Sequence, residues 1–290
     1  MGAHGHLGAT TVMIALLVAL SACTSGSAPD DVPAATTTAT QPAPTKTPGV
    51  TTPSYVALGD SFTAGPGIDP EQPDTGFCQR SQQNWPSLLA ASLDLDLTDV
   101  SCSGATTADL VATVASGAVP ADAGVVTVSA GGNDGGLFLS LIRACTAGTD
   151  ACEVFVDQQA PPILERTTTD LVSLLASVRS EAPDATVTLV GYPRIMPATG
   201  TCAAVGIAEA DVASVVSAEA TLDDALADAA ERAGVTYVSP LERSTGHDAC
   251  AGDEAWTNGT SPTSGDGIFF HPNHRGMKAV AALVAATIGR

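Results

Sequence analysis

The stretch "YVALGDSFTAG" (55–65) decides how this chain folds. Its apolar run ends abruptly in Gly-Asp-Ser, and small residues follow. Gly, Asp and Ser favour turns, so one interpretation is a strand that ends in an ordinary turn. The other is a serine presented at the carboxyl end of a strand, where open parallel sheets place their chemistry.

Apolar, β-branched runs recur along the chain, and each is followed by turn residues and a helical pattern. The runs are 54–58, 97–101, 124–129, 185–192 and 235–239. Helical spacing covers 84–93, 107–115, 153–180, 209–234 and 273–288. Strands that alternate with helices form right-handed crossovers and a parallel sheet covered on both faces. We therefore predict an α/β fold, a three-layer α/β/α sandwich with a five-stranded, flavodoxin-like parallel sheet.

The composition excludes several classes of function. The chain of 290 residues carries 11 basic and 31 acidic side chains, a net charge of −20. Such a surface repels phosphate backbones, so we expect no nucleic-acid partner. The sequence contains no phosphate-binding loop, no dinucleotide fingerprint and no cluster of residues at metal-ligand spacing. We therefore expect neither a cofactor nor a metal.

The N-terminal segment lies outside the predicted fold. Residues 12–23, "VMIALLVALSAC", are apolar, too short to span a bilayer and end in small residues, as export signals do. "LSAC" (20–23) resembles the lipobox of bacterial lipoproteins, in which Cys23 would be lipidated, although no Lys or Arg precedes it. We predict a lipoprotein signal peptide over 1–22, a disordered Thr/Pro-rich tether over 23–53 and a folded domain over 54–290. The protein would be exported, and either lipid-anchored at the outer face of the membrane or secreted.

The remaining cysteines agree with export. They are Cys78, Cys102, Cys145, Cys152, Cys202 and Cys250. An even number of cysteines in an exported chain indicates disulfides. Cys145 and Cys152 are close enough in sequence to close a small loop, whereas spacing alone selects no pairing for the others.

Reactive residues follow the predicted strands or precede the last helix. Ser61 follows the first strand, Gly104 the second and Asn133 the third, and His271 stands directly before Pro272. Acyl transfer needs a nucleophile, a base that takes its proton, and neutral donors for the negative oxygen that develops. These residues supply each of those parts.

Four blocks occur in the order that marks the GDSL-type, or SGNH, hydrolases. They are "GDS" (59–61), Gly104, "GGND" (131–134) and "HPN" (271–273). The chain from about residue 54 onward resembles this superfamily. The resemblance implies that Ser61 is the nucleophile and His271 the general base. It also implies an oxyanion hole made of the Ser61 and Gly104 backbone N–H groups and the Asn133 side-chain amide.

Two further stretches resemble the secreted actinobacterial lipases and esterases of that superfamily. They are "CQRSQQNWPSLLA" (78–90) and "GYPRI" (191–195). This closer resemblance implies disulfides between successive cysteines, Cys78–Cys102, Cys145–Cys152 and Cys202–Cys250.

One position departs from the family pattern. Many members carry an Asp three residues before the catalytic His, but Ile268 occupies that place here. Either Asp266 bends back to the imidazole, or a backbone carbonyl near Ile268 or Phe269 accepts the Nδ1–H. We favour the carbonyl and hence a Ser-His dyad rather than a triad. For Asp60, we expect hydrogen bonds to local backbone N–H groups.

The leading hypothesis is an exported serine esterase or lipase that hydrolyses carboxylic esters through an acyl-enzyme. A carbohydrate O-deacetylase of the same fold is one alternative, and a non-catalytic surface lipoprotein that binds a glycan or lipid is another. The expected partner is an ester of a lipid, a small molecule or a glycan. We expect the protein to be a monomer and to contact a membrane only through its N-terminal lipid anchor. Residues 140–165 are predicted to form either a lid or a helix docked on the sheet.

Overall fold

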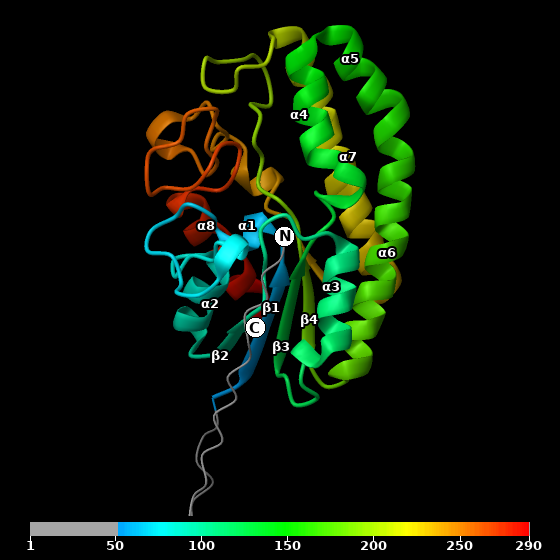
Figure 1. Ribbon diagram of the computed structural model, residues 1–290, viewed down its shortest axis with the longest axis vertical. Coiled ribbons are helices and arrows are strands. Elements are labelled where there is room, and N and C mark those ends of the chain that lie inside the picture. Colours follow the sequence, from blue (N-terminus) through cyan, green and yellow to red (C-terminus); the bar gives the residue numbers. More distant parts are fainter. Residues whose placement is uncertain (1–51, 290) are drawn as a thin grey trace, which may run out of the picture. The chain divides into compact units, whose positions relative to one another are not determined.

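The computed structural model describes residues 52–289, which form a parallel sheet of five strands in the order β2-β1-β3-β4-β5 with helices on both faces (Figure 1). The strands are β1 (Ser54–Gly59), β2 (Asp96–Asp99), β3 (Val125–Ser129), β4 (Thr186–Val190) and β5 (Thr236–Val238). The helices are α1 (Ser61–Ala64), α2 (Trp85–Leu93), α3 (Thr107–Thr113), α4 (Leu137–Ala147), α5 (Thr149–Val154), α6 (Ala160–Glu181), α7 (Glu209–Ala233) and α8 (His274–Ile288). This arrangement confirms the predicted α/β fold. The predicted signal peptide, Cys23 and nearly all of the predicted tether lie outside the described residues.

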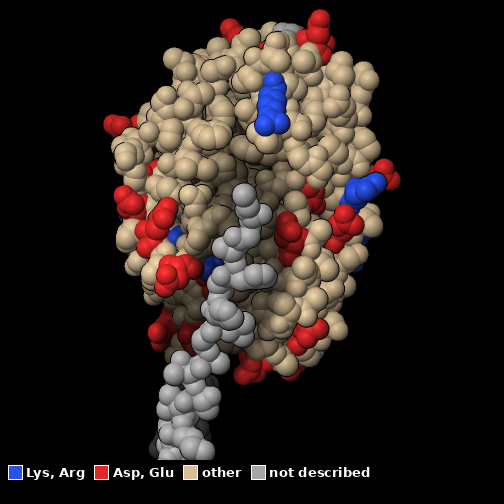
Figure 2. Space-filling view, in the orientation of Figure 1, with Lys and Arg blue, Asp and Glu red and all other residues tan. Residues whose placement is uncertain are grey.

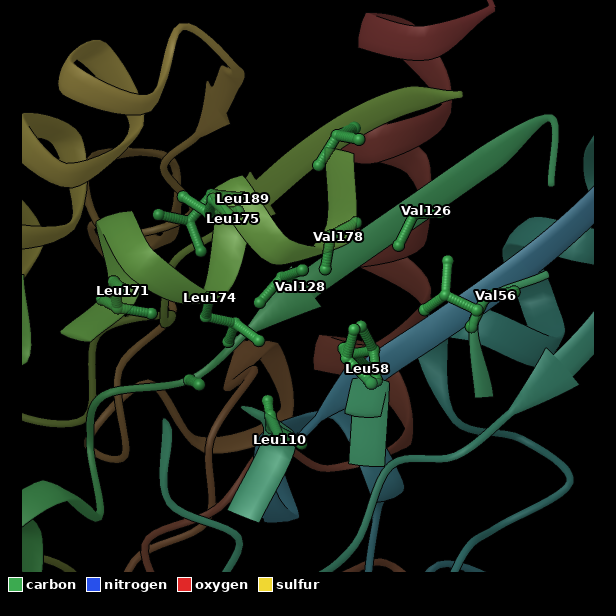
Figure 3. Close-up of a cluster of buried hydrophobic side chains, with 14 of the residues drawn as sticks. Val56, Leu58, Leu110, Val126, Val128, Leu171, Leu174, Leu175, Val178 and Leu189 are labelled. Atoms are coloured by element: carbon green, nitrogen blue, oxygen red, sulfur yellow. The ribbon is translucent and has the colours of Figure 1, made fainter. Parts of the chain in front are cut away.

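The side chains of β1 show why the sheet is covered on both faces. Tyr55 and Ala57 point to one face and Val56 and Leu58 to the other, because successive side chains alternate along a strand. The first pair packs with apolar residues of α2 and α8. The second pair joins a core with the leucines of α6 (Figure 3). All four side chains are buried, which explains why the sequence of this strand is a continuous apolar run.

The parallel register brings the strand ends to one edge. Gly59 at the end of β1 lies opposite Ser129 at the end of β3, and Val128 lies opposite Leu189 of β4. The turns that follow these strands therefore begin at the same level. The predicted site residues are carried by these turns and by the loop before α8.

Helix α4 covers this carboxyl edge rather than a face of the sheet. Its buried residues Leu137 and Leu141 belong to a cluster with Phe62 and Val215, which is separate from the two cores against the sheet. The helix packs on α5 and α7. Of the two predicted alternatives for residues 140–165, a lid or a helix docked on the sheet, α4 does not match the second: it lies beside the turn after β1, where Phe138 packs edge-on against Phe62.

Disulfides join Cys78–Cys102, Cys145–Cys152 and Cys202–Cys250, the same pairs that the resemblance implies. Acidic side chains predominate over Lys and Arg on the face in Figure 2, in line with the net charge of −20. Within residues 52–289, no helix combines the length and apolar composition needed to cross a bilayer.

Candidate active site

Ser61 stands where β1 turns into α1. Asp60 caps the short helix, and its Oδ1 accepts a hydrogen bond from the Phe62 N–H at 2.9 Å. A Cβ at Gly59 would collide with the side chain of Thr63, so glycine is what this tight turn requires. The Gly-Asp-Ser motif therefore encodes a strand-to-helix turn that holds the serine at the edge of the sheet.

His271 reaches Ser61 from the loop before α8. Its Nε2 lies 2.8 Å from the Ser61 Oγ, and its Nδ1 lies 2.8 Å from the Phe269 carbonyl oxygen. Because a carbonyl can only accept, the hydrogen of the neutral ring sits on Nδ1 and Nε2 is left to accept the serine O–H. An imidazole in this tautomer can take the proton of the serine.

The surroundings of His271 keep its ring neutral. Its ring centroid lies 4.7 Å from that of Phe62 and 5.6 Å from that of Phe138. Burial lowers the pKa of His271 from 6.5 to about 4, although the hydrogen bond to the Phe269 carbonyl favours the charged form. A proton acceptor is therefore present down to acid pH.

The two residues singled out for orienting the imidazole make other contacts. The Asp266 Oδ1 accepts the His274 N–H at 2.8 Å, at the beginning of α8. The first N–H groups of a helix have no intrahelical partner and favour a carboxylate, which explains this position. The Ile268 carbonyl accepts the backbone N–H of His271 at 3.3 Å, not the ring. The contact to Nδ1 comes instead from the next carbonyl, that of Phe269.

Three candidate hydrogen-bond donors lie in the turns after β1, β2 and β3. Within residues 52–289, the backbone N–H groups of Ser61 and Gly104 have no hydrogen-bond acceptor. The Asn133 Nδ2 donates one hydrogen to the Ala105 carbonyl at 3.1 Å, which leaves its second hydrogen free. Donors of this kind stabilise an oxyanion if they are fixed before the reaction.

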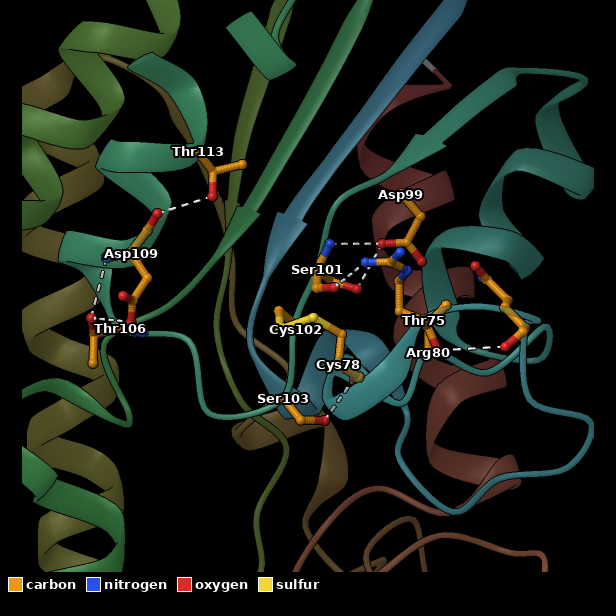
Figure 4. Close-up of a disulfide and its surroundings, with 11 residues drawn as sticks. Thr75, Cys78, Arg80, Asp99, Ser101, Cys102, Ser103, Thr106, Asp109 and Thr113 are labelled. Carbon is orange, nitrogen blue, oxygen red and sulfur yellow. Dashed lines mark hydrogen bonds between the residues drawn. A yellow bond between two sulfur atoms is a disulfide. The ribbon is translucent and has the colours of Figure 1, made fainter. Parts of the chain in front are cut away.

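The turn that carries Gly104 is held from the segment around residues 76–80. Cys102 forms a disulfide with Cys78, and both the N–H and the Oγ of Ser103 donate to the Cys78 carbonyl, at 3.2 and 2.9 Å (Figure 4). The Arg80 Nη1 donates to the Ser101 carbonyl at 2.8 Å. These bonds fix the Gly104 backbone beside the carboxyl end of β1.

An apolar pocket adjoins Ser61 and Asn133, between α4, α6 and α7. Its walls include Phe138, Leu141, Leu164, Met196, Val215 and Ala218. Glu219 is a polar exception: its Oε1 accepts the N–H groups of Ile195 and Met196, and burial raises its pKa to about 7. An apolar group attached to a carbonyl at Ser61 can be buried here. The sequence pattern predicted most of these helices but not the pocket that they enclose.

The sequence did not predict that Tyr192 contacts the residues of this site. Tyr192 follows β4, and its hydroxyl donates to the Asp60 Oδ2 at 2.7 Å, so Asp60 binds more than its local backbone. In the sequence, the stretch "GYPRI" (191–195) served only as evidence of resemblance to the actinobacterial lipases and esterases. Its place after the fourth strand, at the same sheet edge, is the signal that could have found it.

No three His, Cys, Asp or Glu side chains cluster as metal ligands within residues 52–289. The site described above is built from a serine, a histidine and neutral hydrogen-bond donors.

Comparison with known proteins places the chain in a family. Residues 57–279 match the model of the GDSL-like Lipase/Acylhydrolase family. Lipase 2 of Streptomyces coelicolor is 37% identical over 218 residues, which cover 68% of this chain and 72% of that protein. Phospholipase A1 from Streptomyces albidoflavus NA297 has a similar structure, with a TM-score of 0.72 and 29% identity over 83% of this chain and 100% of that one. For the extracellular lipase from Streptomyces rimosus the TM-score is 0.73, with 28% identity over 81% of this chain and 99% of that one. The chain belongs to the GDSL-like lipase/acylhydrolase family and is a carboxylic-ester hydrolase.

Proposed function

We propose that this protein is an exported esterase or lipase that uses Ser61 as a nucleophile on carboxylic esters with apolar acyl chains. The observation that carries the proposal is the 2.8 Å contact between the Ser61 Oγ and the His271 Nε2 beside an apolar pocket. A nucleophile, its base and a place for the acyl chain stand together there.

The reaction begins with attack of the Ser61 Oγ on the ester carbonyl carbon while the His271 Nε2 takes the hydroxyl proton. The negative oxygen of the tetrahedral intermediate accepts hydrogen bonds from the Ser61 and Gly104 N–H groups and from the Asn133 amide. His271 then gives its proton to the departing alcohol oxygen, which leaves an acyl-enzyme on Ser61.

Deacylation repeats these steps with water. His271 takes a proton from the water molecule, whose oxygen attacks the acyl carbon, and returns the proton to the Ser61 Oγ as the carboxylic acid departs. The Phe269 carbonyl holds the imidazole through Nδ1 in both halves of the reaction. The pair acts as a Ser-His dyad in which a carbonyl takes the place of the usual carboxylate.

The pocket favours an esterase or lipase over a carbohydrate O-deacetylase. Its exposed lining is almost wholly apolar, which suits an alkyl chain better than the hydroxyl groups of a sugar. Burying an acyl chain there removes apolar surface from water, which is worth about 0.8 kcal/mol for each CH₂ group. Lipase and phospholipase names among the similar proteins support the same substrate class.

Hydrolysis of p-nitrophenyl esters from acetate to palmitate tests this substrate class. Ala218 lines the pocket from α7, so Ala218→Leu is expected to lower kcat/KM for the octanoate ester by about tenfold and to change the acetate rate by less than about twofold. Ala213→Leu, on the exposed side of the same helix, is the matched control. A wild-type preference for acetate, unchanged in Ala218→Leu, would favour the deacetylase.

We further propose that residues 1–22 direct export of the protein. The mature protein would be a monomer, anchored at Cys23 and tethered by residues 23–53. Disulfides persist in oxidising compartments, which supports export. Likeness to the extracellular Streptomyces rimosus lipase agrees with it. Radiolabelled palmitate fed to expressing cells should label the wild-type protein and not Cys23→Ala. An unlabelled wild-type protein in the medium would instead indicate simple secretion.

A further inference from the structure

We propose that Tyr192 is a positioning residue of this site, which fixes the Asn133 amide relative to Ser61. The inference rests on the proposed function, because it concerns the donors that would hold the oxyanion.

The Tyr192 hydroxyl joins two loops of the site. It donates to the Asp60 Oδ2 at 2.7 Å and accepts the Gly132 N–H at 3.0 Å. Asp60 is the residue before Ser61, and Gly132 is the residue before Asn133. A single oxygen atom from the turn after β4 therefore connects the turn after β1 with the turn after β3.

The backbone at Gly132 is shaped to receive this hydroxyl. A Cβ at Gly132 would lie 3.3 Å from both the Oη and the Cζ of Tyr192, so any other residue would crowd the ring. The Tyr192 ring also packs edge-on against Phe62, with centroids 5.1 Å apart and an interplanar angle of 87°. The hydroxyl is thus held by packing as well as by its hydrogen bonds.

The hydrogen bonds of this link have a definite direction. The Gly132 N–H can only donate, so the Tyr192 oxygen accepts it and the Tyr192 O–H is left to donate to the Asp60 Oδ2. Burial raises the pKa of Asp60 to about 7, against the hydrogen bonds from Tyr192 and from the Phe62 N–H, which lower it.

The link continues to the third donor. The Asn133 Nδ2 donates to the carbonyl of Ala105, the residue after Gly104. The turns after β1, β2, β3 and β4 are therefore joined in series by side-chain hydrogen bonds. Without the Tyr192 hydroxyl, Gly132 and Asp60 each lose a partner, and the Asn133 amide can shift away from the oxyanion. Substrate binding is untouched, because the ring that lines the pocket remains.

Tyr192→Phe tests the inference, with Tyr55→Phe as the matched control. Tyr55 is buried on β1 and its hydroxyl is also hydrogen-bonded, to the Thr127 Oγ1 at 2.9 Å, but at the opposite end of the strand from Ser61. Both variants are assayed on p-nitrophenyl butyrate and on its thiono analogue, with enzyme counted by active-site titration with a fluorophosphonate. Sulfur accepts hydrogen bonds poorly, so the ratio of kcat/KM for the oxo ester over the thiono ester reports on the oxyanion donors.

Tyr192→Phe is expected to lower kcat on the oxo ester by about 10- to 100-fold, less than outright removal of one donor, with KM changed by less than about twofold. The oxo/thiono ratio is expected to fall by about tenfold, and Tyr55→Phe is expected to leave it unchanged. A ratio that stays at the wild-type value, even with a lower kcat or melting temperature, would overturn the proposal, because a merely structural residue affects both esters equally.

Gly132→Ala is the second variant, and it serves if Tyr192→Phe does not fold. It keeps the hydroxyl but crowds it, so the ratio is again expected to fall, and an unchanged ratio again overturns the proposal. Ser61→Ala separates this question from the proposed function. If Ser61→Ala is inactive and the ratio does not move, only the role of Tyr192 fails; if Ser61→Ala keeps the wild-type rate, both fail.

Discussion

Replacing Ser61 by alanine is expected to lower kcat for p-nitrophenyl butyrate by about 10⁵-fold or more. The variant lacks the oxygen to which the acyl group would be transferred, and His271 is left without the hydroxyl that its Nε2 contacts. The donors around the site remain, so any residual rate reflects water attacking a bound ester. Initial rates of purified wild type and variant, at equal concentration of folded protein, give the ratio directly.

The control for this substitution is Ser92→Ala. Ser92 lies in the last turn of α2, where its Oγ donates to the Leu89 carbonyl, and it is expected to keep the wild-type rate. Near-ultraviolet circular dichroism checks that Ser61→Ala is folded. A folded Ser61→Ala with more than about a tenth of the wild-type kcat would mean that another group is the nucleophile, and the proposed mechanism would be abandoned.

The fold and the positions of Ser61 and Asn133 in it could be predicted because local signals and topology agree. Each of the first three blocks follows a β-branched run, and a parallel sheet brings the carboxyl ends of its strands to one edge. Gly59, Asp60 and Ser61 encode their own turn, since each has the conformation or the cap that its position needs. The predicted strands were therefore sufficient to predict that Ser61 and Asn133 lie at the same edge of the sheet.

The orientation of His271 could not be predicted in the same way. Phe270 adopts a φ of 55°, a left-handed conformation that propensity does not predict for phenylalanine. The chain turns there, between the Phe269 carbonyl and the ring that it contacts. Which carbonyl reaches Nδ1 is thus set by the path of a loop, and the sequence showed only that no carboxylate stands three residues before the histidine.

The pocket and Tyr192 were missed because their contacts are long-range. The Tyr192 hydroxyl binds groups 60 and 132 residues away in the chain. The pocket walls come from helices whose apolar spacing is the same whether they face a core or a cavity. Periodicity reports that a residue is buried but not what it is buried against.

Replacing His271 by glutamine should lower kcat by about 10⁴-fold or more, since no other group then takes the serine proton. The pH profile of the wild type carries further information. The base works in its neutral form, so activity is lost as pH falls through the pKa of His271. Burial lowers that pKa to about 4, and kcat/KM is therefore expected to stay level from neutral pH down to about 5 and to be half-maximal near 4.

Asp266→Asn distinguishes the dyad from a triad in the same assay, with the released alcohol quantified by chromatography at each pH. Because the Asp266 carboxylate binds the His274 N–H and not the imidazole, this variant is expected to keep kcat within about threefold and to leave the acid limb in place. A loss of more than about a hundredfold in a folded Asp266→Asn would restore the triad. An acid limb near pH 7 would instead assign control of the rate to Asp60, whose pKa burial raises to about 7. The position of one inflection thus identifies which of two buried groups must lose its proton before Ser61 can react.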